Sequence, residues 1–431
     1  MVRLSGAEAF AIASELLVPG ASLPPSHRAA VRVLQREGRR IDEVLMLCFQ
    51  GPRSFTGEDV VELQCHGGVV NVRLVLDACL AAGARVAEPG EMTRRALLNG
   101  RLDLLQVEAI ADVVRARSDR AHALAQAHLA GRLSAAVESL AAQVAALLVE
   151  VEAGIDFGLE EHVFAVDYAS LAARTATAAS GIEQLLRTHD AGRMRSEGIL
   201  IAIVGRPNAG KSSLLNHLLG RDRAIVSEVA GTTRDTIEET VEHRGLLFRF
   251  VDTAGLHEST DRLELLGMER TQSALRRADA VLLVAVEAEE LERLRPSLVE
   301  HLQPWVVLWN KRDLCASSPG LPDGATAACG VSLKTGAGCD GIWPLLETVA
   351  AAAGVRFDED HELITRARHR EALAEALAGL QRAREAALCG RDAELVALDL
   401  REALDRLGSM TGAVTSDEIL NRIFAGFCIG K

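Results

Sequence analysis

Short apolar runs and polar stretches alternate through the first 118 residues of the chain, and turn-forming Gly and Pro residues separate them. The runs Val44–Phe49, Val60–Gln64 and Ala84–Ala87 have the length and composition of β-strands. A turn signal, Gly51-Pro52, follows the first of them. Because helical stretches lie between these runs, the pattern predicts a compact α+β domain over residues 1–118.

A helical pattern replaces this alternation after residue 118. Apolar residues then recur at steps of mostly three and four, which is the stripe of a long amphipathic helix: Leu124, Leu129, Leu133, Val137, Leu140, Val144, Leu147 and Val151. A second helix is predicted from about Tyr168 to Arg187. The last stretch, from about residue 360 to 431, is rich in Leu, Ala, Arg and Glu and has a helical pattern again.

Between the two helical stretches, strand and helix signals alternate. Ile199–Val204 is an apolar run that leads directly into glycine, as buried parallel strands do. Further strands are predicted at Leu247–Val251, Ala280–Val286 and Trp305–Trp309. This order is typical of a doubly wound α/β domain, which ends near Gly354.

The sequence therefore predicts a multidomain α+β and α/β protein in which an α/β domain is inserted into a discontinuous helical domain. Insertion of this kind is tolerated because the two ends of a domain often lie close together. The predicted segments are the N-terminal α+β domain, the first helical segment, the α/β domain and the second helical segment: residues 1–118, 119–196, 197–355 and 356–431.

Composition narrows the class of protein. Hydrophobic residues make up 48% and charged residues 25% of the 431 residues, as in folded globular chains. No apolar run reaches the length of a membrane span, and the N-terminus has no signal-peptide pattern, so we expect a cytoplasmic location and no membrane partner. The eight cysteines form no CxxC pair. A formal net charge of −13 argues against wrapping nucleic acid by bulk electrostatics.

A phosphate-binding motif follows the run Ile199–Val204. Gly205-Arg-Pro-Asn-Ala-Gly-Lys-Ser212 fits the pattern GxxxxGK[ST] between a strand and a helix. Backbone N–H groups of such a loop surround phosphate oxygens, and the start of the helix adds positive potential. We expect Lys211 to contact the β- and γ-phosphates and Ser212 to bind Mg²⁺.

Three further segments indicate guanine rather than adenine nucleotides. Asp252-Thr-Ala-Gly255 follows a strand, so that Asp252 would hold the magnesium shell and Gly255 would sense the γ-phosphate. In Asn310-Lys-Arg-Asp313, the carboxylate of Asp313 can accept hydrogen bonds from N1–H and the 2-amino group of guanine, a donor pair that adenine lacks. Ser332-Leu-Lys334 has the place of the loop that covers the base, and Thr233 is the expected switch residue for Mg²⁺.

The complete set of predicted GTP-binding residues comes from these motifs and the segment before Thr233. It comprises Asn208, Ala209, Gly210, Lys211, Ser212, Ser213, Ser227, Glu228, Val229, Ala230, Gly231, Thr232, Thr233, Asp252, Thr253, Ala254, Gly255, Asn310, Lys311, Asp313, Ser332, Leu333 and Lys334.

Lysine usage singles out some of the same positions. Only four of the 47 basic residues are lysines: Lys211, Lys311, Lys334 and Lys431. Because ammonium and guanidinium groups are not interchangeable, lysines kept in an arginine-rich chain indicate positions where arginine would not serve, although chance also fits so small a number.

Hydrolysis needs a group that orients water. Many small GTPases have a glutamine after the last glycine of the DxAG segment, whereas this chain has Leu256. Glu264 is the candidate for the role, although from the residues alone a solvated helix carboxylate is the favoured interpretation of Glu264. No arginine finger can be assigned. Asn208 and the segment Ser227–Thr232 instead suggest a K⁺ ion held by a side-chain amide and backbone carbonyls.

Together these motifs resemble the MnmE (TrmE) family of tRNA wobble-uridine modification GTPases. In the second half of the chain the resemblance rests on Gly205–Ser213, Gly231–Thr236, Asp252–Leu256, the flanking helices and the ending Phe427-Cys-Ile-Gly-Lys431. The stretches similar to the folate-binding domain of that family are Gly51–Asp59, Glu62–Gly68, Pro89–Glu91 and Leu98–Asp103. The resemblance covers nearly the whole chain.

The resemblance implies a homodimer formed through the N-terminal domains, each of which binds a tetrahydrofolate derivative (5,10-methylene- or 5-formyl-tetrahydrofolate). It also implies a heterotetramer with an MnmG-type flavoprotein, which brings FAD and NADH. The two proteins would add an aminomethyl or carboxymethylaminomethyl group to C5 of the wobble uridine in tRNA. K⁺-promoted pairing of two GTPase domains would trigger hydrolysis and drive the conformational cycle.

The resemblance also implies roles for individual residues. Folate contacts fall on Arg3, Glu62, Arg101 and Lys431. The K⁺ site falls on Asn208, Ser227, Val229 and Thr232, and Mg²⁺ on Ser212 and Thr233. The catalytic residues are Glu264, which orients water, and Lys211. Cys428 falls on the C-terminal cysteine of the family and is either a reactive thiol near the folate or a packing thiol.

Two departures from the family pattern carry expectations. Members of the family usually begin about one strand before the stretch matched by Arg3–Gly6. Either the start codon is misassigned, or the N-terminal sheet and dimer interface differ, and Arg3 is then expected on a frayed end. Arg101 stands where the family often has lysine, and because the charge is kept, we expect folate binding to be retained.

Three other functions compete with this interpretation. A ribosome-assembly GTPase of the Era or Der kind would share the nucleotide motifs, but the chain has no KH-type GxxG segment or basic tail. A non-enzymatic scaffold could use GTP only to gate an interaction. A folate-dependent transferase acting alone would need its own redox cofactor, and the sequence has no flavin or nicotinamide fingerprint.

Overall fold

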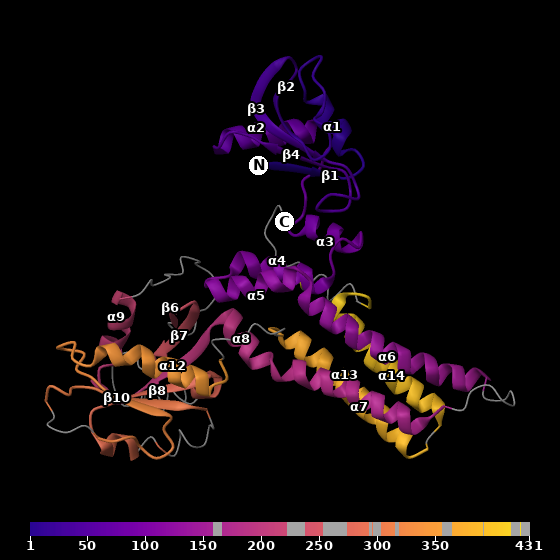
Figure 1. Cartoon of the computed structure of the whole chain (residues 1–431). Coiled ribbons are helices and arrows are strands. Elements are labelled where there is room, and N and C mark those ends of the chain that lie inside the picture. The colour runs from indigo at the N-terminus through magenta and orange to yellow at the C-terminus, as the bar shows by residue number, and fades with distance from the viewer. Residues whose placement is uncertain are drawn as a thin grey trace, which may run out of the picture. The chain divides into compact units, whose positions relative to one another are not determined.

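The computed structural model describes residues 1–157, 166–221, 238–252, 274–292, 295, 303–314, 319–355, 364–390, 392–414 and 423 (Figure 1). Internal contacts divide the chain into two units. The first comprises residues 1–111, 128–166 and 392–431, and the second comprises residues 112–127 and 167–391. The four segments predicted from the sequence are grouped differently, and their boundaries stay a prediction.

The first unit contains a four-stranded antiparallel sheet in the order β1-β4-β3-β2. Its elements are β1 (Val2–Ser5), α1 (Ala9–Glu15), β2 (Ala29–Arg36), β3 (Arg39–Phe49), β4 (Val60–Gln64) and α2 (Val69–Ala81). Side chains alternate between the two faces of each strand. One face packs on α1 and α2 through a core that includes Met46, Leu63 and Val75. The opposite face carries Arg3 and Glu62.

Two expectations about this domain are wrong. Ala84–Ala87 is not a strand, because Gly83, with φ of 105°, turns the chain at the end of α2 and no strand pairs with the segment that follows it in the described part of the chain. Arg3 does not lie on a frayed end. It is in β1 and is paired with Glu62 of β4, so that the strand ladder fixes its backbone.

The predicted long amphipathic helix is divided. Gly131, with φ of 84°, separates α5 (Asp119–Leu129) from α6 (Arg132–Phe157). Within the first unit, α6 packs along α14 (Ala393–Thr411), and Arg401 of α14 pairs with Glu152 of α6. Two shorter helices, α3 (Glu91–Leu98) and α4 (Leu104–Arg115), follow the N-terminal domain. The buried stripe of α6 includes Val137, Val144 and Val151.

The composition of α6 corrects one statement made from the sequence. Residues Arg132–Asp156 form a helix that is long and apolar enough to cross a membrane by these two criteria alone. This is weak evidence for a span, because a core helix meets the same criteria and one face of α6 packs on α14.

The second unit begins with helices. Asp167 caps α7 (Tyr168–Arg187) by accepting hydrogen bonds from the N–H groups of Ala169 and Ser170. Helix α7 packs along α13 (Ala367–Leu388), although nearly 180 residues separate them in the sequence. Helix α8 (His189–Glu197) leads into the sheet of this unit, where Arg193 pairs with Asp279.

A six-stranded sheet forms the centre of the second unit, in the order β10-β9-β8-β5-β7-β6. Its elements are β5 (Ile199–Val204), α9 (Lys211–Arg221), β6 (Glu238–His243), β7 (Leu246–Asp252), β8 (Ala280–Ala285), β9 (Trp305–Trp309), β10 (Ala327–Gly330), η1 (Cys339–Gly341) and α12 (Ile342–Ala352). All pairs are parallel except β6 with β7. Every residue of β5, β8 and β9 is buried, which explains their continuous apolar runs.

Candidate functional site

The nucleotide motifs lie at the carboxyl ends of the strands of the six-stranded sheet. Gly205 follows β5, Asn310 follows β9, and Val331 and Ser332 follow β10. These strands run parallel, so their carboxyl ends open on the same side, which is where doubly wound sheets bind ligands. Asp252 is the last residue of β7 and reaches the same edge.

The phosphate loop is shaped by two glycines and a lysine. A Cβ at Gly205 would lie 2.3 Å from the carbonyl oxygen of Val284, and one at Gly210 would lie 2.1 Å from Nδ2 of Asn310. Only glycine therefore fits these positions. The ammonium of Lys211 donates hydrogen bonds to the carbonyl oxygens of Gly205 (2.8 Å) and Arg206 (2.9 Å), and the side chain is buried. The loop is thus folded around a fixed positive charge.

Asn310 joins the phosphate loop to the loop that covers the base. Its side-chain amide donates to the carbonyl oxygen of Ala209 (2.7 Å) and accepts from the N–H of Leu333 (3.2 Å). The residue is only 4% exposed, so both hydrogen bonds are shielded from water. The structure thus gives Asn310 a bracing role between two loops. Its assignment to the nucleotide itself stays a prediction.

The carboxylate of Asp313, the predicted acceptor for guanine, is held in place by Ser332. Ser332 donates a hydrogen bond of 2.6 Å to Oδ1 of Asp313. This hydrogen bond lowers the pKa of Asp313, and the positive charges of Lys334 and Lys311 act in the same direction. Asp313 therefore stays ionised and acceptor-only, as recognition of N1–H and the 2-amino group requires.

The structure brings together the described nucleotide residues Asn208–Ser213, Asn310–Asp313 and Ser332–Lys334. Asn208 adopts φ of 63°, a left-handed conformation that Asn tolerates. Ser212 lies in the first turn of α9, the position from which a hydroxyl can bind Mg²⁺ beside phosphate. Among the described residues, no group of three or more His, Cys, Asp or Glu side chains could hold a metal ion by itself.

Several predicted residues lie outside the described part of the chain: Ser227, Glu228, Val229, Ala230, Gly231, Thr232, Thr233, Thr253, Ala254, Gly255, Glu264, Cys428 and Lys431. Of Asp252, only the backbone at the end of β7 is described. The roles proposed for these residues stay predictions.

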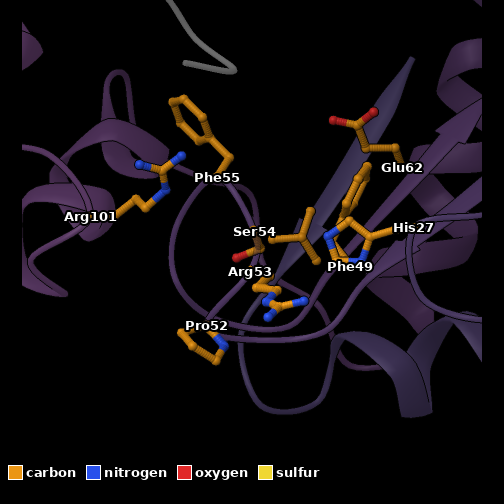
Figure 2. Close-up of a pocket in the computed structure, with 9 residues that line it drawn as sticks. His27, Phe49, Pro52, Arg53, Ser54, Phe55, Glu62 and Arg101 are labelled. Carbon is orange, nitrogen blue, oxygen red and sulfur yellow. The ribbon is translucent and has the colours of Figure 1, made fainter. Parts of the chain in front are cut away.

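A second candidate site lies in the N-terminal domain. A pocket of about 510 Å³ is lined by His27, Phe49, Pro52, Arg53, Ser54, Phe55, Val60, Glu62 and Arg101. Figure 2 shows Phe55 and Arg101 on one side of the pocket and His27, Phe49 and Glu62 on the other. Its walls are therefore aromatic, and its charged groups are guanidinium and carboxylate.

Arg3, a predicted folate residue outside the pocket lining, contacts Glu62, a predicted folate residue that lines the pocket. Arg3 donates from Nε (2.9 Å) and Nη2 (2.6 Å) to Oε1 of Glu62, and its guanidinium lies 5.3 Å from the ring centroid of Phe55. Oε2 of Glu62 has no protein partner among the described residues and remains as an acceptor at the pocket wall. Arg3 is thus a support for Glu62 and Phe55.

Arg101 reaches the pocket because of how α3 ends. The N–H of Arg101 donates to the carbonyl of Ala96 (2.8 Å), and the N–H of Gly100 donates to that of Leu97 (3.0 Å). Gly100 has φ of 67°. These features form a Schellman motif, which reverses the chain after the helix and directs Arg101 toward the pocket.

Sequence reasoning missed the aromatic walls, His27, Phe49 and Phe55, and also Arg53. His27 stands edge-on to Phe49, with ring centroids 5.4 Å apart. A usable signal was present, because Phe55 and Arg53 lie inside the folate-like stretch Gly51–Asp59 and aromatic residues make up only 3% of the chain.

The six-stranded sheet, the phosphate loop and the Asn310–Asp313 segment after β9 are those of a P-loop GTPase. The family profile of the MnmE helical domain matches residues 104–428, and that of the GTP-binding protein TrmE N-terminus matches residues 1–101. The tRNA modification GTPase MnmE of Moorella thermoacetica is 41% identical over 100% of this chain and 96% of its own length. MnmE of Symbiobacterium thermophilum is 43% identical over the same shares. The chain belongs to the MnmE family of tRNA modification GTPases and is a GTP hydrolase.

Proposed function

We propose that this chain modifies C5 of the wobble uridine of tRNA together with an MnmG-type flavoprotein that supplies FAD and NADH. The added group is aminomethyl or carboxymethylaminomethyl, and its one-carbon unit comes from a tetrahydrofolate derivative bound by the N-terminal domain. The protein acts in the cytoplasm as a homodimer that forms a heterotetramer with the flavoprotein. The observation that carries the proposal is that one chain contains both a guanine nucleotide site and an aromatic pocket with surplus positive charge.

The chemistry of the pocket fits a folate. A pterin is a flat heteroaromatic ring whose N–H donors match the available carboxylate oxygen of Glu62, and aromatic side chains offer surfaces for stacking. The glutamyl tail carries carboxylates, which guanidinium groups such as that of Arg101 bind with charge-assisted hydrogen bonds. Folate supplies the one-carbon unit, and the residues of the chain bind and orient it.

The nucleotide site supports a switch. Asp313 and Ser332 select guanine, while Lys211 and the first turn of α9 neutralise phosphate charge. Asn208, already in a left-handed conformation, offers its side-chain amide to a K⁺ ion together with Ser227, Val229 and Thr232. Ser212 and Thr233 hold Mg²⁺, and Glu264 orients the attacking water. Hydrolysis of GTP then changes the conformation of the protein during each modification cycle.

The test is mass spectrometry of nucleosides from tRNA of a strain that lacks the gene. Loss of 5-substituted wobble uridines, and their return with the wild-type gene, is expected. Rescue should fail with Asp313→Asn, which impairs guanine recognition, and with Glu62→Gln, which impairs the folate pocket. Glu37→Gln, at an exposed hairpin outside both sites, is the matched control and should rescue.

Three results would contradict the proposal. Unchanged wobble uridines in the deletion strain would reject the tRNA function and favour a ribosome-assembly role, which profiles of ribosomal subunits would detect. Rescue by Glu62→Gln would reject only the proposed role of the folate pocket and would leave the tRNA function standing. Equal hydrolysis rates in K⁺ and Na⁺ at the same ionic strength would remove the K⁺ site.

A further inference from the structure

We infer that Arg53 is a second anion-binding residue of the N-terminal pocket and makes the site prefer folates with a longer, more negatively charged glutamyl tail. The inference rests on the proposed folate function and deepens it. It begins from a charge imbalance in the pocket lining, which contains Glu62, Arg53 and Arg101.

The one carboxylate of the lining is already neutralised. Arg3, which is not part of the lining, pairs with Glu62 at 2.6 Å and stacks on Phe55. The guanidinium groups of Arg53 and Arg101 have neither a hydrogen bond nor an ion pair with any other described residue. Two positive charges therefore remain at the pocket, and a ligand with at least two negative charges complements them.

Arg53 is presented by a braced loop. The N–H of Gly51 donates to Oδ1 of Asp59 (2.9 Å), and the hydroxyl of Ser54 donates to the carbonyl of Glu58 (2.5 Å). The side chain of Asn99 donates to the carbonyl of Thr56 (2.7 Å), which ties the loop to the end of α3. Ser54 and Thr56 are buried.

Close packing at the ends of the loop adds to this bracing. A Cβ at Gly51 would lie 2.8 Å from the carbonyl oxygen of Gly57, and Gly57 itself has φ of 78° beside Asn99. The backbone that carries Arg53 is thus fixed before a ligand binds. A preorganised charge costs less to use than one that must first be ordered.

The two arginines enter the pocket from different elements. Arg101 follows the Schellman motif of α3, and Arg53 belongs to the loop between β3 and β4. A single carboxylate can satisfy one guanidinium fork, whereas the second fork needs another carboxylate. The two carboxylates of a monoglutamate are joined by one short side chain. Further γ-linked glutamates place additional carboxylates along a flexible chain, which can reach a guanidinium that projects from a different element. Tail length thereby becomes a determinant of affinity.

The experiment measures the affinity of the full chain for 5-formyl-tetrahydrofolate with one and with three glutamates, at fixed ionic strength. We expect wild type to bind the triglutamate roughly three to ten times more tightly, which is the range for a partly exposed charge-assisted contact. In Arg53→Gln this ratio should fall below about twofold, while the monoglutamate remains bound. Raising the salt concentration should also reduce the wild-type ratio.

Arg39→Gln is the matched control. Arg39 is exposed at the β2–β3 hairpin and lies outside the pocket lining. Its substitution by glutamine removes the same charge from the same domain. It should keep the wild-type ratio. A wild-type ratio near one, or an equal ratio in wild type and Arg53→Gln, would overturn the role of Arg53. Equal weakening of both ligands by Arg53→Gln would overturn it too, because the contact would then be to the shared portion of the folate.

Failure of the proposed function gives a different result. If neither folate binds to wild type while GTP still binds, the folate site itself is rejected, and the role of Arg53 falls with it. If both folates bind without a difference in affinity, only the inference about the tail is rejected.

Discussion

Replacing Asn310 by alanine tests whether the two loops of the nucleotide site are held as one. The substitution removes the hydrogen bonds to Ala209 and Leu333 from a position that is 4% exposed. Each such bond contributes about 0.5–1.5 kcal/mol. In the variant, nucleotide binding must order two loops that wild type already holds in place. We therefore expect the free energy of nucleotide binding to weaken by roughly 1–3 kcal/mol, which is about 5- to 150-fold in affinity.

The assay is the dissociation rate of a fluorescent GDP analogue from the full chain, measured by stopped flow. Because most changes of affinity within one site affect dissociation, the rate should rise by about the same factor. Asn99→Ala removes one amide hydrogen bond in the N-terminal domain and is the matched control, which should not change the rate. Emission from Trp305, Trp309 and Trp343, all in the nucleotide-binding domain, reports whether that domain stays folded.

A second ligand separates bracing from direct contact with the base. GDP and 7-deaza-GDP differ only in the acceptor at position 7 of the base. If Asn310 acts through the loops, the variant should lose the same factor with both ligands. A dissociation rate within twofold of wild type would refute the reasoning. A loss confined to GDP would show that Asn310 acts on the base instead.

The remaining predictions concern other residues of the two sites. Asp313→Asn should shift preference from GTP toward xanthosine triphosphate by roughly 100-fold, because the amide can donate to the 2-oxo group where the carboxylate accepted from the 2-amino group; equal competition by both nucleotides would contradict this. Gly210→Ala should abolish nucleotide binding because the added Cβ would meet Asn310, and equilibrium dialysis would detect any binding that remains. Burial raises the pKa of Asp42, but hydrogen bonds from Asn71 and from the N–H and ring of His66 outweigh it and lower that pKa from 3.8 to about 2. The lowered pKa adds about 2 kcal/mol to the free energy of unfolding, fully present above pH 4 and lost as the pH falls toward 2. Asp42→Asn lacks this stabilisation, so the domain should open more often and expose the buried thiol of Cys79, which should react with a maleimide roughly tenfold faster at pH 7.5. Near pH 2, where wild type has lost the same stabilisation, the two proteins should be equally susceptible to pepsin.

The N-terminal domain shows how far local patterns reach. The run Val60–Gln64 matches β4 because an alternating pattern and flanking turns are sufficient to specify a strand. Ala84–Ala87 was also predicted as a strand but is not one, since a strand needs a neighbour with which to form hydrogen bonds. The same limit applies to Arg3, which appears terminal in the sequence and is held in the structure by its pairing with β4.

The sequence by itself determined the nucleotide chemistry, because the phosphate loop and the guanine motif are short segments whose spacing carries the geometry. It also determined α7, which begins and ends at the predicted residues. Only the tertiary structure decided which side chains form the N-terminal pocket. His27, Phe55, Glu62 and Arg101 come from separate elements, and their convergence depends on sheet pairing and on the end of α3. The bracing role of Asn310 was decided in the same way, since its partners lie 101 and 23 residues away in the chain.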